Sequence, residues 1–143
     1  MYRIKTKEET KVYLGLLSER EKELFMGLAQ YLISADGENS VEEEKMILAY
    51  CEEMQISYEN DFTKTTEEEI IEEIEKISTI QAKKIISFEL MGLALVDGCY
   101  HGKEQEMIRK MNKSLELDEN FEEKSRSLIM DYITLQKEME KLF

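Results

Sequence analysis

Hydrophobic residues recur every three or four positions along most of this chain, which is the spacing of an amphipathic α-helix. One such stripe comprises Leu24, Phe25, Leu28, Tyr31, Leu32 and Ala35. Further stripes occupy residues 47–54, 70–77, 107–115 and 121–142. With a weaker helix over 9–17 and an apolar segment over 85–96, the pattern predicts an all-α fold of about seven short helices.

Two of these helices begin at capping boxes, in which a Ser or Thr and a Glu three residues later satisfy free backbone amides. Ser18 with Glu21 predicts a helix over about 19–35, and Thr66 with Glu69 predicts another just after it. Proline is absent and only six glycines occur, so the punctuation typical of β-sheets is missing. The segment "IISFELMGLALV" is apolar on all sides apart from Glu89, and we expect it to form a buried central helix.

The sequence contains an internal repeat at an offset of 61 residues. This offset aligns Leu32 with Leu93, Asp36 with Asp97, Gly37 with Gly98, Glu43 with Glu104, Met46 with Met107 and Ile47 with Ile108. It predicts two helix-loop-helix units over about 21–56 and 82–117, related by a pseudo-twofold axis and sharing one core. Residues 1–18 then form an N-terminal arm with a short helix, and 119–143 form a C-terminal helix, within a single domain spanning 1–143.

Composition and charge narrow the classes of function. A chain of 143 residues suffices for one domain that needs neither a disulfide nor a metal for stability. A formal net charge of −13 repels nucleic acid and anionic lipid, and it suits cations or basic protein partners. No apolar run reaches the roughly 18 residues of a membrane span, the N-terminus lacks the apolar core of a signal peptide, and Cys51 and Cys99 show no disulfide spacing. We therefore expect a cytoplasmic protein without a membrane span.

The first loop, "ADGENSVEEEKMI", resembles the Ala-Asp-Gly, Ser and Glu signature of tellurite-resistance TerB-like domains, and the second copy, "VDGCYHGKEQEMI", is similar. The resemblance covers about residues 21–117. It implies an all-helical domain of bacterial stress-response systems, for which binding of a divalent cation through acidic residues has been proposed. The matching residues are Asp36 and Glu43 in the first copy and Asp97 and Glu104 in the second. The second copy departs from the signature, with valine at 96 and histidine at 101.

Ordinary helix ends explain half of this motif. Ser40 with Glu43 forms another capping box, and the glycine after each aspartate suits the left-handed residue that closes a helix. Asp36 and Asp97 fit less well, because a carboxylate at the C-terminal end of a helix faces the negative end of its dipole, at a cost of roughly 0.3–1 kcal/mol. Each aspartate needs a partner, which is an amide of the next helix, a nearby Lys or Arg, or a cation.

A cation at these loops would be a hard one, because oxygen ligands favour Ca²⁺, Mg²⁺ or Mn²⁺. Neither loop is an EF-hand, since that register places Leu32 and Leu93 at the first ligand position. Asp97, Cys99 and His101 offer only three of the four ligands that are usual for zinc.

The sequence favours a binding role over catalysis. No glycine-rich phosphate loop, Gly-x-Ser-x-Gly elbow or His-Glu-x-x-His motif occurs. We therefore expect a non-enzymatic TerB-like interaction or sensing module with a protein partner, controlled by a divalent cation at the two Asp-Gly loops. The alternative is a metal-free helical scaffold or adaptor in which the same residues only cap helices, and an enzyme with a carboxylate-lined site is a third. The sequence leaves partner identity and oligomeric state open.

Overall fold

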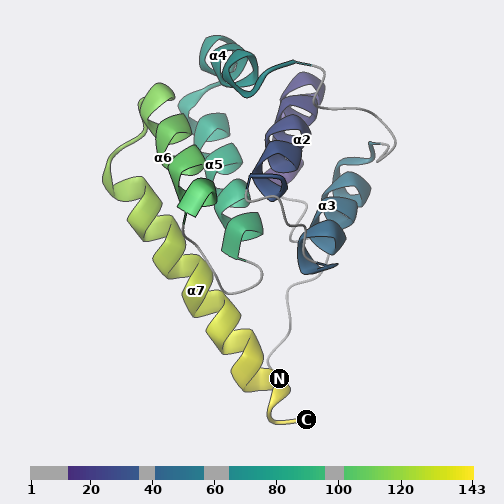
Figure 1. The fold of residues 1–143 in the computed structure, drawn as a ribbon. Helices are drawn as coiled ribbons and strands as arrows, with labels where there is room; N and C mark the ends of the chain where they lie inside the picture. The colour runs from purple at the N-terminus through teal and green to yellow at the C-terminus, as the bar shows by residue number, and fades with distance from the viewer. Residues whose placement is uncertain (1–12, 36–40, 57–64, 96–101) are drawn as a thin grey trace.

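The computed structural model describes residues 13–35, 41–56, 65–95 and 102–143 (Figure 1). These residues form helices and no strand, which confirms the predicted all-α fold. The helices are α2 (Glu19–Ile33), α3 (Val41–Met54), α4 (Glu67–Ile77), α5 (Ile80–Leu95), α6 (Gly102–Ser114) and α7 (Asn120–Glu140). Of the weaker helix predicted over 9–17, residues 13–17 belong to the described part, where Tyr13 and Leu14 are helical and a turn follows them. None of the helices described is long and apolar enough to cross a membrane.

The capping boxes predicted for α2 and α4 are both present. At the start of α2 the Ser18 amide donates to Glu21 Oε1 at 2.8 Å, and the Glu21 amide donates back to Ser18 Oγ at 3.2 Å. Thr66 and Glu69 exchange the same two bonds at the start of α4, each at 3.2 Å. Glu21 also accepts a 2.6 Å bond from Ser78 Oγ, so the first turn of α2 is tied to the residue that ends α4.

A single apolar core holds the helices together. α5 packs against α2, α3, α6 and α7, and α2 also packs against α3, α4 and α6. Phe25 of α2 and Tyr50 of α3 meet edge to face, with ring centroids 5.1 Å apart. Ser87 Oγ of α5 donates to Asn112 Oδ1 of α6 at 2.6 Å, and both side chains are buried. This bond fixes how α6 sits on α5, because a buried polar group that loses its partner costs about 1–3 kcal/mol.

The offset of 61 residues relates helix boundaries as well as sequence. α2 and α5 begin at residues 19 and 80, and α3 and α6 begin at residues 41 and 102. Before α5, Thr79 Oγ1 accepts the Ala82 amide at 3.1 Å, in the same way that Ser18 Oγ accepts the Glu21 amide before α2. Equivalent helices therefore begin at equivalent positions of the repeat.

The second helix of each pair also ends in the same turn. Gln55 closes α3 with φ 57°, and Glu116 follows α6 with φ 58°. In each turn the amide of the next residue donates to the carbonyl five residues back at 3.0 Å, and the left-handed residue donates to the carbonyl three residues back. These are the bonds of a Schellman helix end, formed here without glycine.

α7 lies along one side of the bundle, and its C-terminal half projects beyond the other helices (Figure 1). Ser125 and Ile129 are its buried residues, and the helix packs on α5. Leu128, Leu135 and Leu142 belong to the apolar stripe that predicts this helix, yet all three are exposed. The stripe located the helix correctly, but these three leucines do not lie on the side that α7 buries at Ser125 and Ile129.

Candidate functional site

Most of the predicted cation ligands lie beyond the described part of the chain. Asp36 and Asp97 are outside it, as are Cys99 and His101 of the zinc alternative. Glu43 belongs to the first turn of α3, but its side chain is also outside the described part. Within the described ranges, no three His, Cys, Asp or Glu side chains gather as metal ligands would, and this leaves the two Asp-Gly loops untested. The cation site stays a prediction.

Glu104, the fourth predicted ligand, is the one whose side chain the structure places. It lies in the first turn of α6 and is 7% exposed. A carboxylate this deep requires electrostatic compensation, and the positive end of the helix dipole supplies part of it. The position suits a helix-capping role and a ligand role equally.

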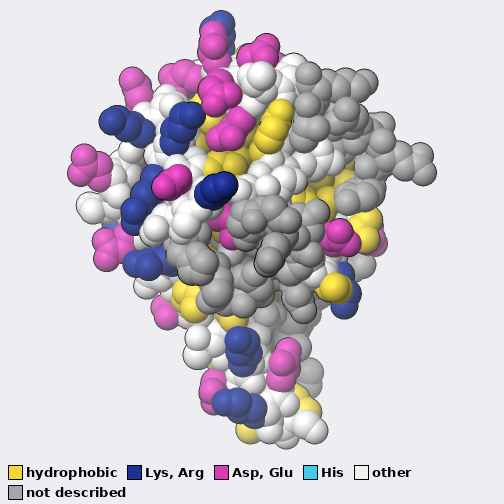
Figure 2. All heavy atoms as spheres, viewed as in Figure 1, with side chains coloured by type: hydrophobic (Ala, Val, Ile, Leu, Met, Phe, Trp, Pro, Cys, Tyr) yellow, Lys and Arg dark blue, Asp and Glu magenta, His cyan; other side chains and the backbone are white. Residues whose placement is uncertain are grey.

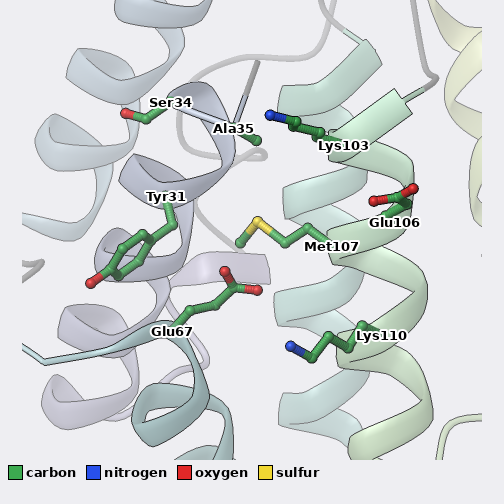
Figure 3. Close-up of a pocket in the computed structure, with 8 residues that line it drawn as sticks. All are labelled: Tyr31, Ser34, Ala35, Glu67, Lys103, Glu106, Met107 and Lys110. Carbon is green, nitrogen blue, oxygen red and sulfur yellow. The ribbon is translucent and has the colours of Figure 1, made fainter. Parts of the chain in front are cut away.

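A cleft of about 390 Å³ lies between the C-terminal end of α2, the start of α4 and one face of α6 (Figure 3). It is lined by Tyr31, Ser34, Ala35, Glu67, Lys103, Glu106, Met107 and Lys110. Figure 3 shows Lys103, Met107 and Lys110 extending from α6 towards α2 and α4, with Glu67 reaching up from α4. Ala35 of this lining directly precedes the first Asp-Gly pair in the sequence.

Charges of both signs meet in this cleft. Burial raises the pKa of Glu67, the neighbouring Glu68 raises it further, and Lys110 opposes the shift. Lys110 Nζ lies 3.2 Å from Glu68 Oε1 in an exposed ion pair. Tyr31 donates its hydroxyl proton to the Thr65 carbonyl at 2.6 Å. With two lysines and two glutamates in the lining, the cleft favours neither anions nor cations.

A second groove, of about 480 Å³, lies between α3, α5 and α7. Most of its lining is apolar or aromatic, comprising Tyr13, Met46, Tyr50, Phe88, Gly92, Leu128, Ile129, Tyr132 and Ile133. Glu89, Gln136, Lys137 and Glu140 complete it. The groove therefore combines four aromatic rings from four separate segments, in a volume typical of ligand and side-chain binding sites.

Two hydroxyl groups of this groove, those of Tyr50 and Tyr132, form hydrogen bonds. Burial raises the pKa of Tyr50 well above its usual value, and the negative charges of Glu89 and Glu53 raise it further. Tyr50 donates to the Glu89 carbonyl at 3.1 Å, and Gln136 Nε2 donates to the Tyr132 hydroxyl at 2.9 Å. The groove thus presents an apolar, aromatic surface with carboxylates close to it.

The described thiol offers no reactive centre. Cys51 is free and buried in α3, and burial raises the pKa of its thiol. Because the thiolate is the nucleophilic form, Cys51 is a poor nucleophile at neutral pH.

Sequence reasoning did not identify the groove between α3, α5 and α7. Its aromatic residues come from segments far apart in the chain, and no local pattern connects them. The available signal was in α7, where Leu128 and Tyr132 belong to an apolar stripe that the fold does not fully bury.

Comparisons of this chain with protein-family models, with curated proteins and with solved structures gave no match. The resemblance to TerB-like domains therefore rests on the two loop motifs. Among the surfaces of the described residues, the aromatic groove offers a defined place for a ligand or partner.

Proposed function

We propose that this chain is a non-enzymatic interaction module whose groove between α3, α5 and α7 receives an apolar segment of a basic protein partner. The observation that supports this proposal is the largely apolar and aromatic lining of the groove. Rings such as Phe88 and Tyr132 offer large contact areas, and Met46 adapts its shape to what it touches. Aromatic residues and methionine are enriched in the cores of protein interfaces.

Charge determines the kind of partner. The chain has a net charge of −13, so a cationic segment is attracted over a long range. Close to the groove, Glu89 and Glu53 act on Tyr50, and Glu140 lies in the lining together with Lys137. Lysine or arginine side chains of the partner can also stack on the aromatic rings. A segment with both apolar and basic residues satisfies both properties of the groove.

Calorimetric titration with a synthetic amphipathic helix of leucine and lysine tests this proposal. We expect binding that weakens at least about tenfold, or about 1.4 kcal/mol, in Phe88→Ala and in Met46→Ala. The matched control is Leu48→Ala, which changes an exposed residue of α3 outside the groove and should bind as the unchanged chain does.

A second peptide, with glutamate in place of lysine, separates charge from apolar contact. It should bind at least about tenfold more weakly than the lysine peptide. Equal binding of the two peptides, or a lysine peptide that binds both groove variants as tightly as the control, would contradict the proposal. Circular dichroism establishes that each variant is folded before its binding is compared.

The resemblance to TerB-like domains suggests that the interaction takes place in a bacterial stress response. It also suggests that a divalent cation bound by Asp36, Glu43, Asp97 and Glu104 controls the interaction. Titration with Ca²⁺, Mg²⁺, Mn²⁺ and Zn²⁺ after chelation tests that control. Binding that disappears in the double variant Asp36→Asn with Asp97→Asn supports the cation. The metal-free scaffold predicts no binding, and equal losses of thermal stability in the double variant with and without metal.

The same proposal includes a symmetric architecture, in which α2–α3 and α5–α6 are two units related by a pseudo-twofold axis around a central α5. The common helix starts support the repeat, as do the matching turns at residues 55 and 116. Packing of α5 on four other helices supports its central place. The seventh helix, over 9–17, stays a prediction.

A further inference from the structure

The chain carries a segment of its own that combines apolar and basic residues. Residues 1–12, which we name the basic segment, have two glutamates and four basic residues, which are Arg3, Lys5, Lys7 and Lys11. The net charge of this segment is +2, whereas the chain as a whole carries −13, so the remaining residues carry −15. Its apolar residues are Met1, Tyr2, Ile4 and Val12. This is the chemistry that the groove between α3, α5 and α7 selects in a partner.

The basic segment is joined to the chain at the groove itself. Tyr13 directly follows the segment, lines the groove and is exposed. The residues after Tyr13 are fixed, because Leu14 and Leu17 are buried in the core. The amides of Leu16 and Leu17 also donate to the carbonyls of Tyr13 and Leu14, at 3.1 Å each. The segment therefore starts from an anchored point in the lining of the groove.

We propose that the basic segment occupies this groove when no partner is bound, so that a partner has to displace it. The inference rests on the proposed role of the groove as a binding site, and it adds a form of regulation. Alternate residues of an extended chain point to opposite sides. Tyr2 and Ile4 therefore face the groove together, while Arg3 and Lys5 stay at its solvent-exposed edge.

The segment is long enough to lie along the groove. The lining residues of α7 run from Leu128 to Glu140, which is about 18 Å at a rise of 1.5 Å per residue. Ile4 is nine residues from Tyr13, so an extended chain carries it up to about 30 Å from that anchor. The apolar residues of the segment can thus reach the α7 side of the groove from Tyr13.

Charge and apolar contact both favour this occupant. The acidic remainder of the chain attracts a segment of net charge +2. α6 has the same net charge, but it is packed in the bundle against α2, α4 and α5. On the face shown in Figure 2, the projecting end of α7 has Lys or Arg and Asp or Glu side chains next to one another, with hydrophobic side chains beside them. An occupant of the groove therefore needs apolar groups as well as positive charge, and residues 1–12 have both.

The short connection makes even a weak contact effective. A segment joined next to its site has an effective concentration on the order of 1 mM. A contact that a separate peptide would make with a dissociation constant of about 0.1 mM then fills the groove in about nine of ten molecules. A partner that binds only the open groove is weakened about tenfold by this occupancy.

NMR spectra of the methionine methyl groups test the contact in the 143-residue chain. Met46 lines the groove, whereas Met26 is fully buried in α2 and does not line it. In the double variant Tyr2→Ser with Ile4→Ser, the methyl resonance of Met46 should move and that of Met26 should stay in place. An unmoved Met46 resonance would overturn the proposal.

The matched control for this measurement is Ile77→Ser with Ile80→Ser. It removes two exposed isoleucines that do not line the groove, so the Met46 resonance should stay where it is in the unchanged chain. An equal shift of Met46 in the control would also overturn the proposal. Circular dichroism establishes that both double variants are folded.

A synthetic peptide of residues 1–12 measures the contact without the covalent connection. Added to the chain with Tyr2→Ser and Ile4→Ser, the peptide should bind with a dissociation constant of about 0.1 mM in calorimetric titration. The same peptide with serine at positions 2 and 4 should bind at least about fivefold more weakly, because it loses its two apolar contacts. Absence of binding, or equal binding of the two peptides, would contradict the proposal.

The leucine–lysine helix tests whether a partner displaces the segment. It should bind the chain with Tyr2→Ser and Ile4→Ser about tenfold more tightly than the unchanged chain. Phe88→Ala should cost more helix affinity in that background than in the unchanged chain, where it also weakens the competing segment. Equal helix binding by the two chains, or an equal cost of Phe88→Ala in both, would overturn the displacement.

These measurements keep the inference distinct from the proposed function. A helix that binds neither chain contradicts the proposed partner, and the Met46 resonance with the peptide of residues 1–12 then decides whether the basic segment occupies the groove. A helix that binds both chains with equal affinity supports the partner and overturns the basic segment.

Discussion

α4 and α7 are both amphipathic helices at the surface, but they use their apolar residues differently. Ile70, Ile71 and Ile74 of α4 are all buried in the core. In α7, by contrast, Leu128 and Leu135 stay exposed. An amphipathic pattern thus shows that a helix has an apolar face, whereas only packing shows whether the same chain covers it.

The two helices are also fastened differently. α4 begins at the Thr66 capping box, and Glu73 binds the guanidinium of Arg20 through two bonds of 2.6 and 2.7 Å. Glu119, the residue before α7, makes no side-chain capping bond, and α7 is tied to α6 by Arg109 Nε, 3.0 Å from Glu122 Oε2. α4 is an integral part of the core, whereas α7 is held by its first half.

The largest effect should come from truncating the buried face of α4. Ile74 is fully buried, so Ile74→Ala removes packed methyl groups and leaves a cavity, and it should lower the free energy of unfolding by about 2–5 kcal/mol. Urea denaturation measures this loss. Ile77→Ala, at an exposed position of the same helix, is the control. Similar losses of unfolding free energy in the two variants would contradict the different burial of Ile74 and Ile77.

A smaller effect is expected at the helix starts. Thr66→Ala removes the acceptor for the Glu69 amide and should lower the free energy of unfolding by about 1 kcal/mol. Glu119→Ala should change it by less than about 0.5 kcal/mol, because Glu119 caps nothing. Thermal and urea unfolding of the two variants check this difference. Equal destabilisation would show that the stability of α7 depends on its N-cap residue as much as that of α4 does.

The ion pair of α4 should contribute less still, and its contribution depends on pH. The hydrogen bond from Arg20 lowers the pKa of Glu73, so the pair stabilises the fold above the unfolded pKa of about 4.3 and loses this effect as pH falls through the lower folded pKa. Both groups are partly exposed, and solvent screening limits the effect to about 1 kcal/mol or less.

Glu73→Gln should therefore be less stable than the unchanged chain at neutral pH and equally stable in acid well below about pH 4. Urea midpoints measured across this range check the prediction. Glu72→Gln, whose partner Lys76 lies on the same helix, is the matched control. A difference that persists in strong acid would assign the effect to something other than the Glu73 charge.

The smallest effect on stability should come from the exposed leucines of α7. Leu135→Ala should change the free energy of unfolding of the dilute protein by less than about 0.5 kcal/mol, because no cavity forms at an exposed site. A loss comparable with that of Ile74→Ala would mean that Leu135 packs within its own chain.

Local patterns predicted the local structure of this chain well. The Ser18 and Thr66 capping boxes fixed the starts of α2 and α4, because a cap depends on residues within one turn. The apolar period located α7, but it did not show which side of α7 faces α5. That side depends on how the two helices pack, and it carries Ser125 and Ile129.

The groove and the cation loops show the limits of sequence reasoning in different ways. Tyr50, Phe88 and Tyr132 meet only after three helices have packed, so their sequence spacing carries no sign of the groove. The ligand prediction at Asp36 and Asp97 came from a motif, and those residues lie outside the described ranges. Of the four predicted ligands, only Glu104 can be assessed by its surroundings, and its burial suits both roles.

Gln55 and Glu116 close their helices in a backbone region that favours glycine, and neither is glycine. A side chain with a Cβ atom is disfavoured there by on the order of 1–2 kcal/mol, and both turns nevertheless keep the same hydrogen bonds. Gln55 and Glu116 are 61 residues apart, so the two copies of the repeat bear the same conformational cost at the same position. This is expected if the two copies arose by duplication and kept the turn while the residue in it changed. The 61-residue offset is therefore visible in backbone angles even at positions where the two residues, a glutamine and a glutamate, differ.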